Sequence, residues 1–473
     1  MTNSSPAGVP ETAETAPSTN RMRLGCGVVI GALLLGVLIL GGAWFVSNRR
    51  ASEKLAIQVA KVRARGEPLT TVELNDFYRP AENRPDMTHE ILTALALCQD
   101  DGLNPLAASL PFVGQGQNPP TVPEPWAQLA DAKAYLARLK QPIAIFHEVA
   151  RRDGTARFPV DFSPGVGTLL NQTQSLRLGP RILTLQFHVD LHQGNFPDAV
   201  ECILTQIALA RVLDREPTLV SQLVQLALAN SAIANIQALV RQADLSDGDL
   251  ERLQLGLRKF DFQPSLKCAL AGERTFGYMA CVDPNRMTGE SAAVTAAEAR
   301  QIAQRTPQRV QDATRILDFS LRISEAADES LSAALRESER VEADLKSLSA
   351  GMINKILYGL TLQTTPAYIR ALTAFIRSTA KRDCGDAALA CERYRRQHGT
   401  WPESLAQLVP EFLPTVPIDQ FSEQPLKMIV SSDEIKIYSV GLDGIDDLGA
   451  LSDDQQPHTD IGIAVPARSG AKP

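Results

Sequence analysis

Positive charge, aromatic residues and histidine are all scarce in this chain of 473 residues. Lys and Arg number 47 against 54 Asp and Glu, and the net charge of −7 excludes the basic face typical of nucleic-acid-binding proteins. Aromatic residues make up only 5%, which disfavours a β-sandwich and, with abundant Ala and Leu, favours helices. Hydrophobic residues make up 44%, too many for wholesale disorder. The composition therefore predicts a mostly α-helical protein with no nucleic-acid partner.

The sequence also lacks the short motifs that mark common catalytic sites. It has no Gly-x-x-x-x-Gly-Lys-Ser/Thr phosphate loop, no Gly-x-Ser-x-Gly elbow, no His-Glu-x-x-His motif and no Cys-x-x-Cys pair. His188 and His192 are four residues apart and would share one helix face, but no third metal ligand accompanies them. We interpret this pair as packing residues. With six histidines and no cluster of them, the sequence predicts that the protein is not an enzyme.

The seven cysteines do not form the framework of a small disulfide-rich domain. Cys26 lies in an apolar run. Cys384 and Cys391 are two helical turns apart, about 10 Å along a helix axis, which is too far for a mutual disulfide. The even count outside the apolar run permits disulfides without requiring them, and buried free thiols are the expected state. These six are Cys98, Cys202, Cys268, Cys281, Cys384 and Cys391.

One long hydrophobic run follows an N-terminal tail. Residues 1–23 are rich in Ser, Thr, Pro and Ala and are predicted to be disordered. Residues 24–46 carry no charge, and a helix of that length spans roughly 35 Å, enough to cross a hydrocarbon core of about 30 Å. A cleaved signal peptide would be shorter and would end in small residues, whereas Trp44 and Phe45 close this run. We therefore predict one uncleaved transmembrane helix that binds the lipid bilayer.

The orientation of this helix depends on two opposing signals. Arg21 and Arg23 precede it, whereas six basic residues follow it between residues 49 and 65, so the positive-inside rule alone favours a cytosolic body. Long domains, however, are translocated largely regardless of charge. The C-terminal resemblance described below favours the outside. We therefore expect a single-pass protein with a cytoplasmic N-terminus and an extracytoplasmic C-terminal domain.

Residues 50–284 are predicted to form an α-helical body, either an array or a bundle, and residues 285–365 a helical connector. Gly194-Asn195 separates two helical stretches, and Pro197 lies in the first turn of the second, where its missing N–H costs nothing. No repeat of fixed period is present. Ser246 is a good helix start for the residues that follow it.

Two details of this body are open to alternative interpretations. Residues 218–241 are strongly apolar on one side, but four amides interrupt them, so we predict a core helix rather than a second membrane span. These amides belong to Gln222, Gln225, Asn230 and Asn235. Glu273 lies within a predicted helix, and we expect it in a salt bridge or on a solvent-exposed face rather than as a buried acid.

Residues 366–473 are predicted to form a long helix followed by a small α+β module. The helix is expected to begin at Pro366 and to end before Gly399, with a short second helix that ends at Val409. Residues 427–430 and 434–440 alternate as strands and are joined by a tight turn, and residues 461–465 form a third strand. The pattern predicts an antiparallel sheet.

An acidic loop lies between the second and third of these strands. It holds six Asp within 18 residues and no Lys or Arg, so bare carboxylates would repel one another. A hard cation with oxygen ligands, of which calcium is the expected one outside a cell, would relieve this repulsion. The alternative is a solvated acidic loop. The spacing does not match a 12-residue EF-hand loop.

Residues 388–461 resemble the globular domain of the major pseudopilin of type II secretion. The matching segments are Glu392-Arg393-Tyr394, His398-Gly399, Trp401-Pro402-Glu403-Ser404-Leu405, Leu413-Pro414, Val416-Pro417-Ile418-Asp419, Gln424-Pro425-Leu426, Ile437-Tyr438-Ser439-Val440-Gly441-Leu442-Asp443-Gly444 and Asp460-Ile461. The resemblance implies a helix packed on a small antiparallel sheet. It also implies a calcium ion in the final loop, held by Asp side chains and backbone carbonyls. The ligands it implies are Asp443, Asp460 and the Leu442 carbonyl, followed by Asp446 and Asp447.

These observations favour a membrane-anchored extracytoplasmic interaction or scaffold protein with an unidentified protein partner. The alternative is an accessory component of a type II secretion or pilus-like envelope machine, and an enzyme in the helical body is a third class. The overall layout resembles planctomycete-type single-pass membrane proteins that carry such a module after a helical region. Because the module follows the whole helical body and lies far from the apolar run, we do not expect it to assemble into a fibre.

Overall fold

The structure is a computed structural model that describes residues 35–36, 42, 46, 49–99, 101–283, 306–451 and 459–467. The chain divides into two compact units, Met1–Lys54 and Leu55–Pro473. The predicted tail and nearly all of the predicted transmembrane segment, residues 24–46, lie outside the described residues. In the first unit, residues 49–54 are helical.

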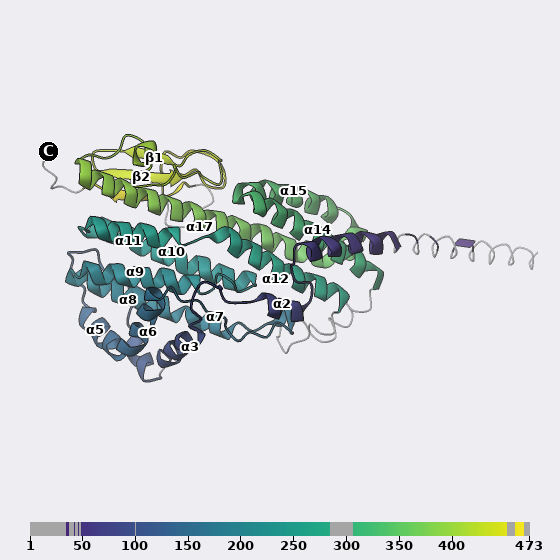
Figure 1. Ribbon diagram of the computed structural model, residues 1–473, viewed down its shortest axis with the longest axis horizontal. Helices are drawn as coiled ribbons and strands as arrows, with labels where there is room; N and C mark the ends of the chain where they lie inside the picture. The colour runs from purple at the N-terminus through teal and green to yellow at the C-terminus, as the bar shows by residue number, and fades with distance from the viewer. Residues whose placement is uncertain are drawn as a thin grey trace, which may run out of the picture. The chain divides into compact units, whose positions relative to one another are not determined.

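The second unit is mostly helical with a small antiparallel sheet near its C-terminus, which confirms the predicted fold class at this level. Its helices, named as in Figure 1, are α2 Thr71–Phe77, α3 Thr88–Leu97, α4 Asn104–Ala107, α5 Leu129–Arg138, α6 Lys140–Arg151, α7 Asn171–Leu176, α8 Leu178–Gln193, α9 Phe196–Arg211, α10 Leu219–Gln242, α11 Asp247–Arg258, α12 Phe262–Val282, α14 Thr306–Glu329, α15 Leu331–Ser349, α16 Met352–Leu357 and α17 Gly359–His398. Its strands are β1 Lys427–Val430, β2 Glu434–Ser439 and β3 Ile461–Pro466.

The helical hairpin of α8 and α9 follows the local signals in the sequence. Gly194 ends α8 with a positive φ of 73°, and Pro197 lies in the first turn of α9, as predicted. Ser246 caps α11 by accepting a hydrogen bond from the Asp249 N–H. These ends depend on residues next to them in the chain, which is why the sequence predicts them well.

Helix α10 is the core helix that its amides indicated. It packs against α9, α12, α17 and β3. The Gln222 side chain donates to the Leu213 and Glu216 carbonyls at 2.6 and 2.8 Å. Among the described residues, α10 alone is long and apolar enough to cross a membrane, yet 61% of its apolar window is buried inside the fold. The side-chain NH2 groups of its four amides all donate within the fold, to backbone carbonyls, Asp214, Ser378 and Gln206, whereas the side-chain oxygens of Gln222, Gln225 and Asn230 are buried without a partner among the described residues.

The expectation for Glu273 is wrong. Its carboxylate is largely buried and accepts a hydrogen bond from the Leu219 N–H, at the N-terminus of α10, over 2.9 Å. Burial raises the pKa of Glu273. The first N–H groups of a helix have no partner within the helix and carry partial positive charge, so a carboxylate from another helix stabilises them. The sequence around Glu273 carries no sign of this distant partner.

Residues 55–69, which we call the stem, connect the first unit to the helical core. Residues 55–64 are helical. The Glu67 carboxylate pairs with Arg274 of α12, whose side chain is fully buried. The Thr275 hydroxyl donates to the Pro68 carbonyl at 2.9 Å. The apolar side of the stem packs on α14, through contacts among Leu55, Val59, Val62, Leu69, Leu317 and Leu321.

Helix α17 begins at Gly359, so the prediction that it begins at Pro366 is wrong. The Asp312 carboxylate of α14 accepts hydrogen bonds from the Leu360 and Thr361 N–H groups, both at 2.9 Å. These bonds cap the N-terminus of α17 from a distant part of the chain, and the helix continues through Pro366. Gly399 ends the helix with φ of 78°, as predicted.

Figure 1 shows α17 (light green) between the sheet and helices α10 and α11. The sheet order is β1-β2-β3, with both pairs antiparallel, which confirms the predicted strands and their direction. Ile435 and Ile437 of β2 are fully buried. Because one helix packs against both the sheet and the body, the C-terminal module shares its core with the rest of the second unit.

The cysteines in the described part of the chain match the expected state. All six, from Cys98 to Cys391, are buried, and none forms a disulfide among the described residues. Burial raises the pKa of the Cys98 thiol to about 12, which keeps it protonated and unreactive.

Candidate cation site in the C-terminal module

The acidic loop leaves β2 through Gly441 and returns to β3 at Asp460. Gly441, Gly444 and Gly449 all adopt left-handed backbone conformations, with φ of 72°, 67° and 71°. A bridge between Leu451 and Asp460 closes the loop. Residues 452–458, with two of the six Asp, lie outside the described residues. The described part of the loop is therefore folded back on the end of the sheet.

Asp460 is the best placed of the predicted ligands. Its side chain is buried, and its Oδ2 accepts a hydrogen bond from the Gly449 N–H at 2.8 Å. Its Oδ1 is also buried and has no hydrogen-bond partner within the described part of the chain. Burial raises the pKa of Asp460, the Gly449 and Asp447 N–H groups lower it, and the nearby Asp446 and Asp447 carboxylates add to the rise, so that the pKa is raised overall. A buried carboxylate oxygen without a donor is costly, and a bound cation would satisfy it.

Asp446 and Asp447 lie near Asp460 but differ in what they offer. Asp446 pairs with Lys427 at 2.9 Å and accepts hydrogen bonds from the Tyr438 hydroxyl and the Leu448 N–H. Its bond to Lys427 lowers the pKa of Asp446. Its oxygens are thus engaged by β1 and β2, whereas Asp447 lies close enough to act on the charge of Asp460.

Asp443 and Leu442 occupy the first turn of the loop. The Asp443 carboxylate accepts a hydrogen bond from the Ile445 N–H at 3.2 Å, which stabilises its own turn. Leu442 is exposed. Among the described residues, no three His, Cys, Asp or Glu side chains form a group that could hold a metal ion. The feature that would suit a cation here is the buried Oδ1 of Asp460, with the charge of Asp447 nearby.

A buried carboxylate at Asp419, which was not among the predicted site residues, lies beside the acidic loop. Its oxygens accept hydrogen bonds from the Phe421 N–H, the Ser422 hydroxyl, the Ser439 hydroxyl and the Val440 N–H, at 3.0, 2.9, 2.7 and 3.2 Å. It joins the loop before β1 to the end of β2, where the acidic loop starts. The signal that could have found it is its place in the Val416-Pro417-Ile418-Asp419 segment, with a serine three residues later.

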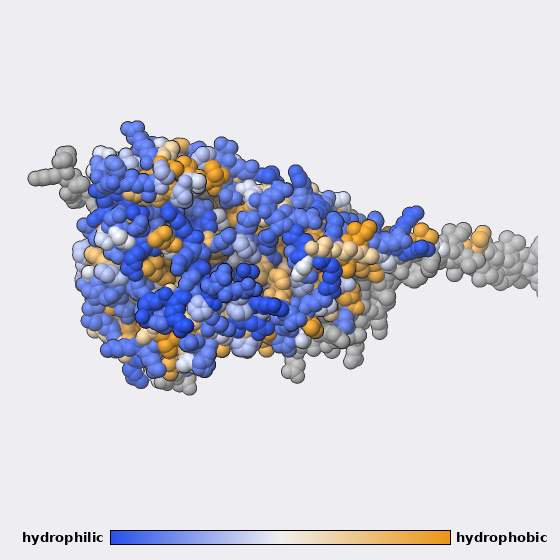
Figure 2. Space-filling view, viewed as in Figure 1, coloured by the Kyte–Doolittle hydropathy of each residue, from blue (hydrophilic) through white to orange (hydrophobic). Residues whose placement is uncertain are grey.

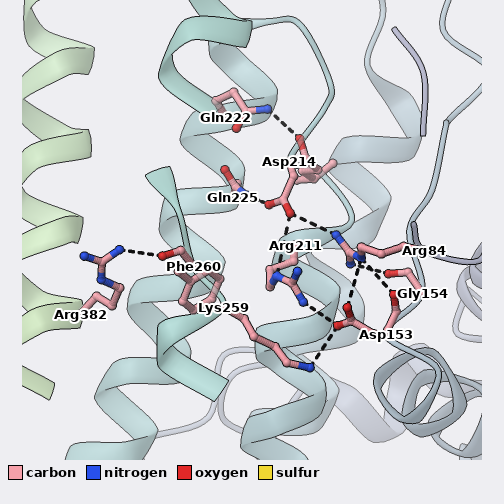
Figure 3. A network of polar contacts seen from close by, with 11 residues as sticks. Arg84, Asp153, Gly154, Arg211, Asp214, Gln222, Gln225, Lys259, Phe260 and Arg382 are labelled. Atoms are coloured by element: carbon pink, nitrogen blue, oxygen red, sulfur yellow. Dashed lines mark hydrogen bonds and ion pairs between the residues drawn. The ribbon is translucent and has the colours of Figure 1, made fainter. Parts of the chain in front are cut away.

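A second cluster of charged residues joins three helices of the body. Figure 3 shows Asp153, which follows α6, between Arg84, Arg211 of α9 and Lys259 at the end of α11. Asp153 approaches Arg211 at 2.6 Å and Lys259 at 3.2 Å. Burial alone would raise the pKa of Asp153, but these cations lower it overall. Because each charge in the cluster faces an opposite one, we interpret it as a structural tie.

The two histidines of α8 pack as predicted. The His188 ring stacks on Phe112 with centroids 5.0 Å apart, and burial and its neighbour His192 lower the pKa of His188 to about 4. His192 Nδ1 is hydrogen-bonded to the His188 carbonyl at 2.8 Å.

A cavity of about 620 Å³ between α5, α6, α8 and α9 is lined by Lys133, Lys140, His147, Asp190 and Asp198, among others. Asp190 accepts a hydrogen bond from Gln186 at 2.9 Å, and burial raises the pKa of Asp190 to about 6. The cavity wall carries both signs of charge and selects no ligand class on its own.

Comparison of the chain with known protein families, curated proteins and solved structures finds no match.

Proposed function

We propose that the protein is a single-pass, membrane-anchored interaction or scaffold protein that presents its second unit outside the cytoplasm and carries a calcium-stabilised C-terminal module. The observation that carries this proposal is the chain order: a charge-free run of 23 residues precedes one compact helical unit. The charged cluster around Asp153 ties helices together, which supports a rigid surface rather than a reacting centre. The helix-on-sheet core of the module supports its resemblance to the major pseudopilin.

The alternative function is an accessory component of a type II secretion or pilus-like machine. The folding of residues 388–461 as a helix against an antiparallel sheet, with an acidic loop before the last strand, favours it. Cross-linking in intact cells distinguishes the two functions, because an accessory component would be recovered with secretion subunits. An enzyme is the third class, and no geometry described here favours it.

The membrane anchor is tested with the full chain. After an alkaline wash of membranes, we expect the protein to stay in the pellet and a variant that lacks residues 24–46 to be released. In spheroplasts, we expect an added protease to degrade the second unit. Full protection of the second unit would place it in the cytosol and would contradict the proposed orientation. Release of the intact chain by the wash would contradict the anchor itself.

Calcium is expected to raise the melting temperature of the full chain in detergent, relative to EDTA. A ligand at about 100 times its Kd stabilises the folded state by about 2.7 kcal/mol. We expect Asp460→Asn to abolish this gain. In EDTA the same variant should melt close to the wild type, because burial already disfavours the charged form of Asp460.

Asp433→Asn is the matched control for calcium binding, since Asp433 is exposed in the turn between β1 and β2. The same experiment separates two ligand sets. If Asp447→Asn reduces the calcium response and Asp443→Asn does not, a site built on Asp460 and Asp447 is favoured; the reverse result favours a site built on Asp460 and Asp443. If calcium does not change the melting temperature of the wild-type protein, the loop is a solvated acidic loop without a bound ion.

A further inference from the structure

Helix α16 exposes hydrophobic side chains where a soluble surface would carry polar ones. It has six residues, none of them buried. Met352, Ile353 and Ile356 are 83%, 72% and 51% exposed. Residues three and four apart share a helix face, so these side chains form one patch, which we call the α16 patch. A short helix normally turns such a face toward the core.

The α16 patch lies at the end of the second unit where the stem joins it. Helix α16 packs on α14, α15 and α17. Three residues after it, Leu360 packs on a small cluster formed by Cys281, Ala313 and Ile316, and Leu55 of the stem packs on the same cluster. Figure 2 shows hydrophobic side chains gathered at this end of the unit. The patch and the start of the stem are therefore close neighbours.

The length of the chain limits how far this end can lie from a bilayer. Leu55 lies nine positions after Val46, the last residue of the charge-free run, so nine residue steps separate them. Fully extended they reach at most about 30 Å, and as a helix about 14 Å. Residues 49–54 are helical, which favours the shorter reach. A headgroup layer at the end of the run is therefore within reach of this end of the unit.

The charges nearby favour an anionic lipid surface over another protein. Lys355 is exposed on α16, next to Ile356. Arg49, Arg50 and Lys54 precede the stem, with Glu53 as the single acidic residue among residues 49–54. Apolar side chains beside exposed cations are typical of helices that lie in a membrane interface. Basic residues next to a membrane span are attracted to anionic headgroups.

We propose that α16 lies in the headgroup region of an anionic bilayer, with Met352, Ile353 and Ile356 inserted among the upper acyl chains. This inference rests on the membrane anchor proposed above. The anchor and the α16 patch would then give the second unit two points of contact with one bilayer. Two contacts fix the tilt of the unit, whereas a single stem leaves it free to swing.

The test uses the full chain in vesicles of phosphatidylcholine and phosphatidylglycerol. Ile353→Cys, made in a Cys26→Ala background, is labelled with an environment-sensitive fluorophore; the other six cysteines are buried. We expect blue-shifted emission and at least twofold quenching by lipids that carry a nitroxide near the headgroup. Val430→Cys on β1, an exposed hydrophobic position in the C-terminal module, is the matched control and should show neither effect.

Each outcome separates the α16 patch from the anchor. If the chain resists alkaline extraction but the label at 353 behaves like the label at 430, the inference is wrong and the anchor stands. If the chain is extracted, the anchor fails, and persistent nitroxide quenching at 353 would show that the patch binds lipid by itself. Quenching that depends on protein density rather than on nitroxide lipid would indicate a second copy of the chain and overturn the inference. Met352→Ser with Ile356→Ser should lower the quenching at 353 without releasing the chain.

Discussion

Replacing Glu67 with alanine is expected to destabilise the second unit by about 3–5 kcal/mol, because it removes the partner of a fully buried arginine. The Arg274 side chain has no solvent exposure, and that of Glu67 is only 13% exposed. The other contact of the guanidinium is a long one of 3.5 Å to the Ser324 hydroxyl. In Glu67→Ala the positive charge would stay in the core without compensation. Urea unfolding of the full chain in detergent measures the loss.

Two variants control for this effect. Glu342→Ala removes an exposed pair with Lys346 on α15 and should cost less than about 1 kcal/mol. Glu67→Ala combined with Arg274→Leu removes both charges and should recover most of the lost stability, since a hydrophobic replacement of a buried pair is often neutral. If the double variant is as unstable as Glu67→Ala alone, the loss of stability comes from the packing of the stem rather than from the unpaired charge of Arg274.

Asp419→Ala is expected to destabilise the C-terminal module by about 3–4 kcal/mol, because four donors converge on this carboxylate. Two are backbone N–H groups and two are serine hydroxyls. The side chain is buried, so water cannot replace the lost acceptor without opening the sheet. Hydrogen exchange of the β2 and β3 amides measures the change locally, and protection there should fall.

The matched control for Asp419 is Ser422→Ala, which deletes one of the four donors and should cost about 1 kcal/mol. The Ser422 hydroxyl is only partly buried. Asp419→Asn retains one acceptor oxygen and should fall between the two. If Asp419→Ala leaves the exchange of β2 unchanged, the carboxylate does not hold the sheet, and the module is stabilised by its apolar contact with α17 alone.

The parts of the fold that sequence predicts well are those set by neighbours in the chain. Gly194 ends α8, Ser246 begins α11, and alternation sets the strands. Each signal lies within a few residues of the feature it marks. The predictions that failed, the start of α17 and the environment of Glu273, depend on distant partners. Asp312 caps α17 from 48 residues away, and Glu273 caps α10 from a different helix. No local pattern contains these pairs.

In the candidate site, too, the local features were predictable from sequence and the contacts between distant residues were not. The acid-rich loop is visible in the sequence, and Asp460 was among its named ligands. Which of the other carboxylates approaches Asp460 depends on the path of the loop, and this path is set by three left-handed glycines and by Lys427 on β1. Lys427 forms an ion pair with Asp446. The spacing of the acidic residues alone does not reveal this contact between strand and loop. Asp419 was overlooked because a buried aspartate has no periodic signature.

Helix α17 sets the distance between the stem and the sheet within the second unit. Its N-terminus packs beside the stem through Leu360, and its C-terminal half carries the sheet, where Cys384 contacts the Ile461 carbonyl. Its 40 residues rise by about 60 Å as one continuous helix. A partner that bound the exposed side of β1 would therefore lie near the opposite end of this helix from the stem.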